Sequence, residues 1–272
     1  MKLHFEWPLD FQESAVNAVA DLFRGQEICR TEFTVTKPSR GQIGLEFGGA
    51  DLGVKPGVGL QQSLGLEQSS LGIGNRLTLL DDEILENLRT VQLHNGLRPS
   101  ESLASGDFTV EMETGTGKTY VYLRTIFELN RQYGFTKFVI VVPSIAIKEG
   151  VYKTLQITRD HFEQYFPSAK GYDFFIYDSA KLGLVRDFAT SPHIRIMVIT
   201  VGAINRFGDE DEAKQQEARD KPTTNVMYRR NEKLSDERPI DLVSATRPIV
   251  IIDEPQSVDG GLEGQGRKAI DK

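Results

Sequence analysis

Short runs of valine, isoleucine and phenylalanine in the second half of the chain constrain its fold more than any other feature. They lie at residues 138–142, 173–177, 194–200 and 248–252. Strands that are apolar at consecutive positions are buried on both faces, as in a parallel sheet that helices cover on each side. The pattern therefore predicts an α/β fold with a doubly wound, mostly parallel sheet in three layers, α/β/α.

Helical spacing of apolar residues predicts the layers that cover this sheet. Near the amino terminus, residues 10–24 form an amphipathic pattern in which Asp10 and Glu13 are spaced as in a capping box. The apolar face expected for this helix comprises Phe11, Ala15, Val19, Leu22 and Phe23. Further helices are expected at 76–95, 118–132, 146–165 and 180–189, and a further strand at 108–112.

We expect residues 1–272 to form a single domain that carries two inserts. Between about 30 and 75 the chain is rich in glycine and small polar residues, which predicts strands, turns or a flexible insert without chemistry. Residues 208–238 combine many charged side chains with few apolar ones, which is typical of a solvated surface loop.

Composition excludes several classes of protein. Hydrophobic residues make up 39% of the chain, and no apolar run reaches the roughly 18 to 20 residues that a membrane span needs. The amino terminus lacks a signal-peptide pattern, and the single cysteine, Cys29, allows no internal disulfide. We therefore expect a cytoplasmic protein with no membrane partner. Because the net charge is −7, any contact with nucleic acid is expected to be local.

The segment 112–119, Met-Glu-Thr-Gly-Thr-Gly-Lys-Thr, lies between a predicted strand and a predicted helix. Glycines in such a turn let backbone N–H groups point at phosphate oxygens, and the start of the next helix adds partial positive charge. Lys118 is placed to reach the β and γ phosphates of ATP, and the Thr119 hydroxyl to coordinate Mg²⁺. The expected nucleotide-binding residues are Glu113, Thr114, Gly115, Thr116, Gly117, Lys118 and Thr119.

The first glycine of the usual phosphate-loop pattern is replaced here by Met112. P-loop helicases commonly relax that position, whereas kinases and small GTPases more often keep the glycine. The departure therefore favours a helicase-type loop. The alternative, a chance Gly-Lys-Thr in an ordinary loop, does not explain why a helix follows at once.

A phosphate loop needs an acidic partner at the end of a neighbouring strand. Residues 248–256, Pro-Ile-Val-Ile-Ile-Asp-Glu-Pro-Gln, meet this need because an apolar run delivers two carboxylates to the edge of the sheet. Asp253 is expected to bind Mg²⁺ through water, and Glu254 to act as the base or to position the attacking water. The alternative is a strand that ends in a charged turn.

Together these motifs resemble those of superfamily 2 helicases. Gln256, after Asp-Glu-Pro, differs from the residue that DEAD-box and DEAH helicases carry there. The segments 110–120, 141–150 and 251–258 resemble the restriction (Res) subunit of type III restriction-modification enzymes, as does the helix at 10–19. The resemblance covers essentially the whole chain and implies a RecA-like first motor domain that uses ATP and Mg²⁺.

The resemblance also implies roles for residues outside the two motifs. Gln12 corresponds to a glutamine that reads the edge of adenine, for which an amide is chemically suited; the alternative is an exposed helix glutamine. Pro143 and Ser144 correspond to a turn that contacts the DNA backbone. Lys148 joins them as a phosphate contact, although a helix cap at Ser144 and a solvated lysine are the alternatives. Thr200 and Asn205 are weaker candidates for a second contact.

The implied partners are double-stranded DNA and a modification (methyltransferase) subunit. A second motor domain and a nuclease domain are not expected in this sequence, so we expect a truncated part of a longer protein that binds ATP and hydrolyses it poorly unaided. Three alternatives stay open: a catalytically silent nucleotide- or DNA-binding module, another superfamily 2 helicase, or another P-loop enzyme such as a kinase or a transporter ATPase.

Overall fold

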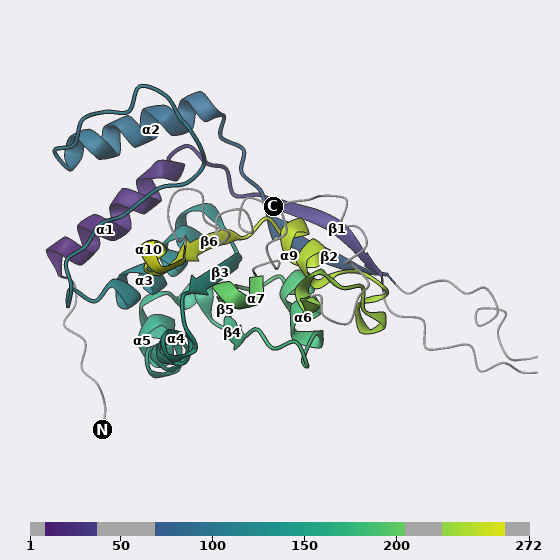
Figure 1. Ribbon diagram of the computed structural model, residues 1–272. Coiled ribbons are helices and arrows are strands. Elements are labelled where there is room, and N and C mark those ends of the chain that lie inside the picture. The colour runs from purple at the N-terminus through teal and green to yellow at the C-terminus, as the bar shows by residue number, and fades with distance from the viewer. Residues whose placement is uncertain (1–8, 37–68, 205–224, 259–272) are drawn as a thin grey trace, which may run out of the picture.

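The central feature of the fold is a sheet of four parallel strands in the order β4–β5–β3–β6. The computed structural model describes residues 9–36, 69–204 and 225–258 (Figure 1). The strands are β3 (Lys137–Val142), β4 (Asp173–Ile176), β5 (Arg195–Thr200) and β6 (Ile249–Ile252). The four apolar runs of the sequence are therefore strands of one sheet, as predicted.

Helices and one β-hairpin surround this sheet (Figure 1). The longer helices are α1 (Asp10–Ala20), α2 (Asp81–His94), α3 (Lys118–Tyr133), α4 (Ile145–Ile157), α5 (Arg159–Tyr165), α6 (Gly183–Thr190) and α9 (Pro239–Ala245). Two single turns, α7 (Val201–Ile204) and α10 (Pro255–Val258), follow strands β5 and β6. The hairpin pairs β1 (Arg30–Thr36) with β2 (Ser69–Asn75). None of the described helices is long and apolar enough to cross a membrane.

Side chains on opposite faces of the sheet belong to two separate hydrophobic clusters. In β3, Ile140 and Val142 pack in the cluster that includes residues of α3, α4 and α5. Val139 and Val141 pack in the other cluster, with residues of α6, α9 and β1. Because successive strand residues point to opposite faces, both faces need a cover, and the result is the predicted three-layer, RecA-like α/β/α fold.

The first helix differs from its predicted form. Leu9 is its N-cap and Asp10 already lies in the first turn, so the predicted capping box is wrong. The buried residues are Gln12, Val16 and Ala20, whereas Phe11 is 49% exposed. The buried face is the one that contacts α3. It is shifted by one residue from the apolar face that the sequence predicted.

Residues 108–112 do not form the predicted strand. They are irregular, and Val110 is 47% exposed. Within the described part of the chain β6 pairs only with β3, and no strand pairs with this segment. An extended sequence becomes a strand only when another edge is available to bond with it. The helix predicted at 146–165 is likewise two helices, α4 and α5, which meet at Thr158.

Part of the predicted surface loop at 208–238 packs into the core. Met227, Tyr228 and Leu234 are buried against α6 and α9, and the Tyr228 hydroxyl donates to the carbonyl of Ile204 at 2.7 Å. The few apolar residues of this segment therefore anchor it to the hydrophobic core. Residues 208–224 of the predicted loop, and 37–68 of the predicted insert near the amino terminus, lie outside the described residues.

Asn75 joins the hairpin to the central sheet. Its side chain is buried and accepts hydrogen bonds from the backbone N–H groups of Thr136 (2.8 Å) and Lys137 (3.1 Å). It also donates to the carbonyl of Lys137 at 2.8 Å. Its own backbone N–H donates to the carbonyl of Thr246, before β6, at 2.8 Å. One residue therefore ties the hairpin to the amino ends of β3 and β6.

We expect Asn75→Ala to lower the free energy of unfolding by about 3 kcal/mol, because it leaves the buried backbone N–H groups of Thr136 and Lys137 without their partner. Urea unfolding followed by circular dichroism measures the change. Asn17→Ala is the control, because Asn17 is exposed on α1 and the substitution should change stability by no more than about 0.5 kcal/mol. Equal effects of the two substitutions would contradict the assigned role of Asn75.

Candidate active site

The carboxyl edge of the parallel sheet collects several residues that the sequence singled out. Val142 at the end of β3 pairs with Thr200 at the end of β5. On the other side of β3, the backbone N–H of Asp253 donates to the carbonyl of Val141 at 3.0 Å, which extends the β3–β6 pairing by one residue. Thr200 at the end of β5, Pro143 after β3 and Asp253 after β6 therefore lie at a common edge.

The glycine-rich turn before α3 has the backbone form expected of a phosphate loop. Gly115 and Gly117 have φ angles of +84° and +82°, which side-chain-bearing residues rarely adopt. The Thr116 hydroxyl donates to the carbonyl of Glu113 at 2.7 Å and closes the turn. Lys118 is the first residue of α3, so the positive end of a 16-residue helix lies at the loop.

The residues of this loop are accessible to a ligand. Glu113, Thr114, Gly115, Gly117 and Lys118 are all exposed, and Thr116 and Thr119 are partly exposed. Irregular chain precedes the loop where a strand was predicted. The segment that leads into the loop is therefore not the predicted strand. The turn and the helix that follows it are as predicted.

Asp253 lies beside the start of α3. The Tyr122 hydroxyl, at the start of the second turn of that helix, donates to Oδ2 of Asp253 at 3.3 Å. Burial raises the pKa of Asp253 above its ordinary value, while the hydrogen bond from Tyr122 and the charge of Lys118 lower it. Lys118 and Asp253, 135 positions apart in the sequence, are thus close enough to interact electrostatically.

Glu254 adopts a strained backbone conformation next to Asp253. Its φ angle is +54°, and its side chain is exposed. A non-glycine residue in this region costs on the order of 1 kcal/mol, and such strain concentrates at functional sites. Pro255 follows as the first residue of α10. The chain therefore turns sharply between β6 and α10, and both carboxylates stand at that turn.

The oxygen donors gathered here suit Mg²⁺. Thr119 supplies a hydroxyl and Asp253 a carboxylate, and the phenol of Tyr122 hydrogen-bonds with the carboxylate and lies near the hydroxyl. Mg²⁺ prefers oxygen ligands and is usually held by one or two protein groups together with phosphates and water. The donor set fits that requirement, because two protein oxygens stand beside a loop that is open to a phosphate chain.

Gln12 is buried rather than exposed on α1. Its Nε2 donates to the carbonyl of Thr116 in the phosphate loop at 3.0 Å. A Cβ atom on Gly117 would lie 3.0 Å from the same Nε2. The exposed-glutamine alternative is therefore wrong, and α1 contacts the loop directly through this side chain.

The candidate DNA-contact residues are engaged in local interactions. Ser144 is the N-cap of α4, and its hydroxyl accepts a hydrogen bond from the backbone N–H of Ile147 at 3.3 Å. The Lys148 ammonium lies 3.7 Å from the carboxylate of Glu149. Pro143, Ser144 and Thr200 share the sheet edge with Asp253, whereas Asn205 lies outside the described residues. The helix-cap alternative for Ser144 is correct, and a cap leaves the second hydroxyl lone pair available.

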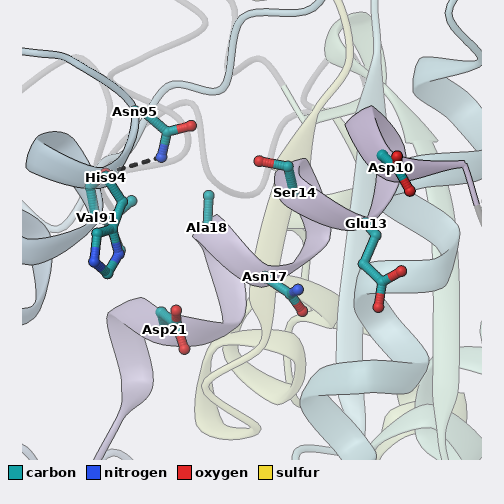
Figure 2. Close-up of a pocket in the computed structure, with 9 residues that line it drawn as sticks. All are labelled: Asp10, Glu13, Ser14, Asn17, Ala18, Asp21, Val91, His94 and Asn95. Carbon is teal, nitrogen blue, oxygen red and sulfur yellow. Dashed lines mark hydrogen bonds between the residues drawn. The ribbon is translucent and has the colours of Figure 1, made fainter.

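A groove of about 420 Å³ lies between α1 and α2, and Gln12 is not among the residues that line it (Figure 2). The carboxylates of Asp10 and Glu13 line it from α1, with Asp21 just after that helix, and Val91 and His94 line it from α2, with Asn95 at its C-cap. Three carboxylates disfavour a polyphosphate. The groove is therefore not a nucleotide site.

Comparison with protein families shows which family shares these motifs. Residues 82–255 match the family described as "Type III restriction enzyme, res subunit", so the match includes both the phosphate loop and Asp253–Glu254. The chain belongs to the Res subunit family of type III restriction enzymes. The resemblance of the motifs to that family is confirmed.

Individual Res subunits support the same assignment. The chain is 30% identical over 206 residues to the Res subunit of the type III restriction-modification enzyme EcoP15I from Escherichia coli. It is 28% identical over 213 residues to the EcoPI Res subunit of Escherichia phage P1. These alignments cover 68% and 70% of the chain but only 20% of each relative. A Salmonella typhimurium relative, the StyLTI Res subunit, is 52% identical over 63 residues, 22% of the chain and 6% of the relative.

The sequence did not reveal the role of Tyr122, which lies within the helix expected at 118–132. A signal was present, because a partly buried tyrosine needs a partner for its hydroxyl. Its position three residues after Thr119 places it on the side of α3 near the loop. The partner, Asp253, is 131 positions away and became apparent only in the structure.

We expect Gln12→Ala to loosen the phosphate loop by removing its hydrogen bond to Thr116. Backbone N–H groups of residues 113–119 should then exchange with deuterium roughly fivefold faster, since one hydrogen bond contributes about 1 kcal/mol. Hydrogen exchange with mass spectrometry measures this. Gln164→Ala, at an exposed position of α5, should leave the loop unchanged. Unaltered exchange in Gln12→Ala would show that the contact does not hold the loop.

Proposed function

We propose that this chain is the ATP-binding first motor domain of a type III Res subunit, acting with Mg²⁺ as a DNA-dependent ATPase and translocase. The observation that carries the proposal is the approach of Asp253 to Lys118 and Tyr122 at the start of α3. Two motifs that phosphoryl transfer needs together lie at one edge of the fold. The alternative of a kinase or transporter ATPase has no support from the family match.

The triphosphate is proposed to lie against the turn at 113–117, whose backbone N–H groups and the adjacent helix start suit anionic oxygens. Lys118 holds the β and γ phosphates, and Thr119 and Asp253 hold Mg²⁺ directly or through water. When bound, Mg²⁺ neutralises charge that develops on the phosphates. Glu254 accepts the proton of the attacking water or orients it.

Gln12 is proposed to recognise adenine while it supports the loop. One N–H of its amide is used by Thr116, which leaves the carbonyl oxygen and the second N–H. An adenine edge offers an acceptor and an amino donor, which match those two groups. The same side chain would then contact both the adenine base and the loop that holds the phosphates.

DNA is proposed to cross the carboxyl edge of the sheet near Pro143, Ser144, Lys148 and Thr200. Contacts there would be to the sugar-phosphate backbone, which suits a motor that moves regardless of sequence. The relatives are Res subunits of restriction-modification enzymes. We propose a modification subunit as the partner, with DNA cleavage carried out by the complete enzyme.

A catalytically silent nucleotide- or DNA-binding module is the second candidate. The chain spans about a fifth of the length of the curated relatives it matches, so their whole activity does not transfer to it automatically. Both candidates predict nucleotide binding. They differ in whether hydrolysis depends on Glu254, and the two substitutions below separate them.

Lys118→Ala should weaken binding of ATP with Mg²⁺ by roughly 10- to 100-fold, because a charged donor to the phosphates is lost. Isothermal titration calorimetry of the folded chain measures the affinity. Lys153→Ala, at an exposed position of α4, is the matched control and should bind as the unsubstituted chain does. Equal affinities for both variants would reject the phosphate-loop assignment.

Glu254→Gln should leave ATP affinity within about twofold and lower turnover by roughly 10²- to 10⁴-fold, as expected when a general base is removed. Turnover is measured as the ATPase rate of a complete Res subunit that carries the substitution, with duplex DNA and a modification subunit present. Glu32→Gln, exposed on β1, controls for the loss of one negative charge. A large loss of affinity with normal turnover would mean that Glu254 has another role, and no turnover in the unsubstituted protein would favour the silent module.

A further inference from the structure

We propose that Tyr122 is a positioning residue for magnesium: its hydroxyl, between Thr119 and Asp253, holds the Asp253 carboxylate in the orientation that receives the ion. The inference rests on the proposed function and adds a residue that neither motif contains. Tyr122 touches neither nucleotide nor metal in this role. It acts through Asp253.

The geometry behind the proposal is a contact between two distant segments. The Tyr122 hydroxyl donates to Oδ2 of Asp253 at 3.3 Å. The Thr119 hydroxyl, one helical turn earlier, lies close enough to the phenol to influence its pKa. The tyrosine therefore stands beside both the hydroxyl and the carboxylate that are proposed to share the ion, although they lie on different elements.

Asp253 needs such support because its strand leaves it poorly held. β6 has four residues and, among the described strands, pairs with β3 alone. Val250 is 38% exposed, and the next residue after Asp253 has a strained φ of +54°. The backbone of Asp253 is anchored by its bond to Val141. Its side chain accepts a hydrogen bond from the Tyr122 hydroxyl.

The tyrosine ring is suited to this task because it is itself held firmly. Tyr122 is partly buried and packs against the cluster around α3 and β3. A carboxylate has about four lone-pair sites. One bond from Tyr122 thus orients the group and leaves sites for a metal or for its bound water. Groups that orient a metal ligand in this way typically change metal affinity 10- to 100-fold when they are removed.

Tyr122→Phe tests the proposal because it keeps the ring and removes only the hydroxyl. The Mg²⁺ concentration that gives half-maximal binding of a fluorescent ATP analogue should rise about 10- to 100-fold. Binding of the same analogue in EDTA should change less than about twofold, because the phosphate loop is intact. An unchanged Mg²⁺ requirement would overturn the proposal, and so would an equal loss of binding in EDTA.

Tyr133→Phe is the matched control on the same helix. The Tyr133 hydroxyl is buried and donates to the carbonyl of Ala20 at 2.9 Å, far along α3 from the loop. Its removal should lower the melting temperature without altering the Mg²⁺ requirement. If Tyr133→Phe shifted that requirement as much as Tyr122→Phe, the effect would be general loosening and the proposal would fall.

A double substitution shows whether Tyr122 acts through Asp253. In an Asp253→Asn background, Tyr122→Phe should cause no further rise in the Mg²⁺ requirement, because the group that it orients no longer binds the ion. Additive effects would place the action of Tyr122 elsewhere and overturn the proposal. If the unsubstituted chain bound the analogue without any dependence on Mg²⁺, the proposed function would fail as well. Dependence in that chain with an unaffected Tyr122→Phe would reject this inference alone.

Discussion

Parallel pairing of β3 with a strand on each side is the constraint on which the rest of the structure depends. Parallel strands end at the same edge, so residues that follow β5, β3 and β6 meet there although they are far apart in sequence. The helix that leaves the phosphate loop packs on one face of that sheet and brings Tyr122 to Asp253. Local motifs become one site only because the sheet has this register.

Much of the fold could be predicted because its signals are local. Consecutive apolar residues identified all four central strands, and glycines at 117 and 134, each with positive φ, bound α3 close to its predicted limits. The segment 108–112 had the composition of a strand but lacks a partner among the described residues. Pairing is a long-range property, so composition alone could not decide it. The packing of Met227 and Leu234 was missed for the same reason.

The site was predictable to the extent that single motifs encode it. Lys118, Thr119 and Asp253 were singled out by residue type and order, and the structure brings Asp253 close to the start of α3, while their roles toward phosphate and magnesium stay predictions. The partners of Gln12 and Tyr122 did not follow, because helical periodicity shows which residues share a face and not what covers that face. Each of these polar side chains bonds to a group more than 100 positions away.

Hydrogen bonds at both ends of α1 hold this helix against α3 and the loop before it. Near its start Gln12 is bonded to Thr116, and at its end the carbonyl of Ala20 receives the hydroxyl of Tyr133. Eleven residues of helix span about 16 Å and resist bending. The two hydrogen bonds therefore fix both ends of α1 against α3, one at the glycine turn and the other near the end of α3.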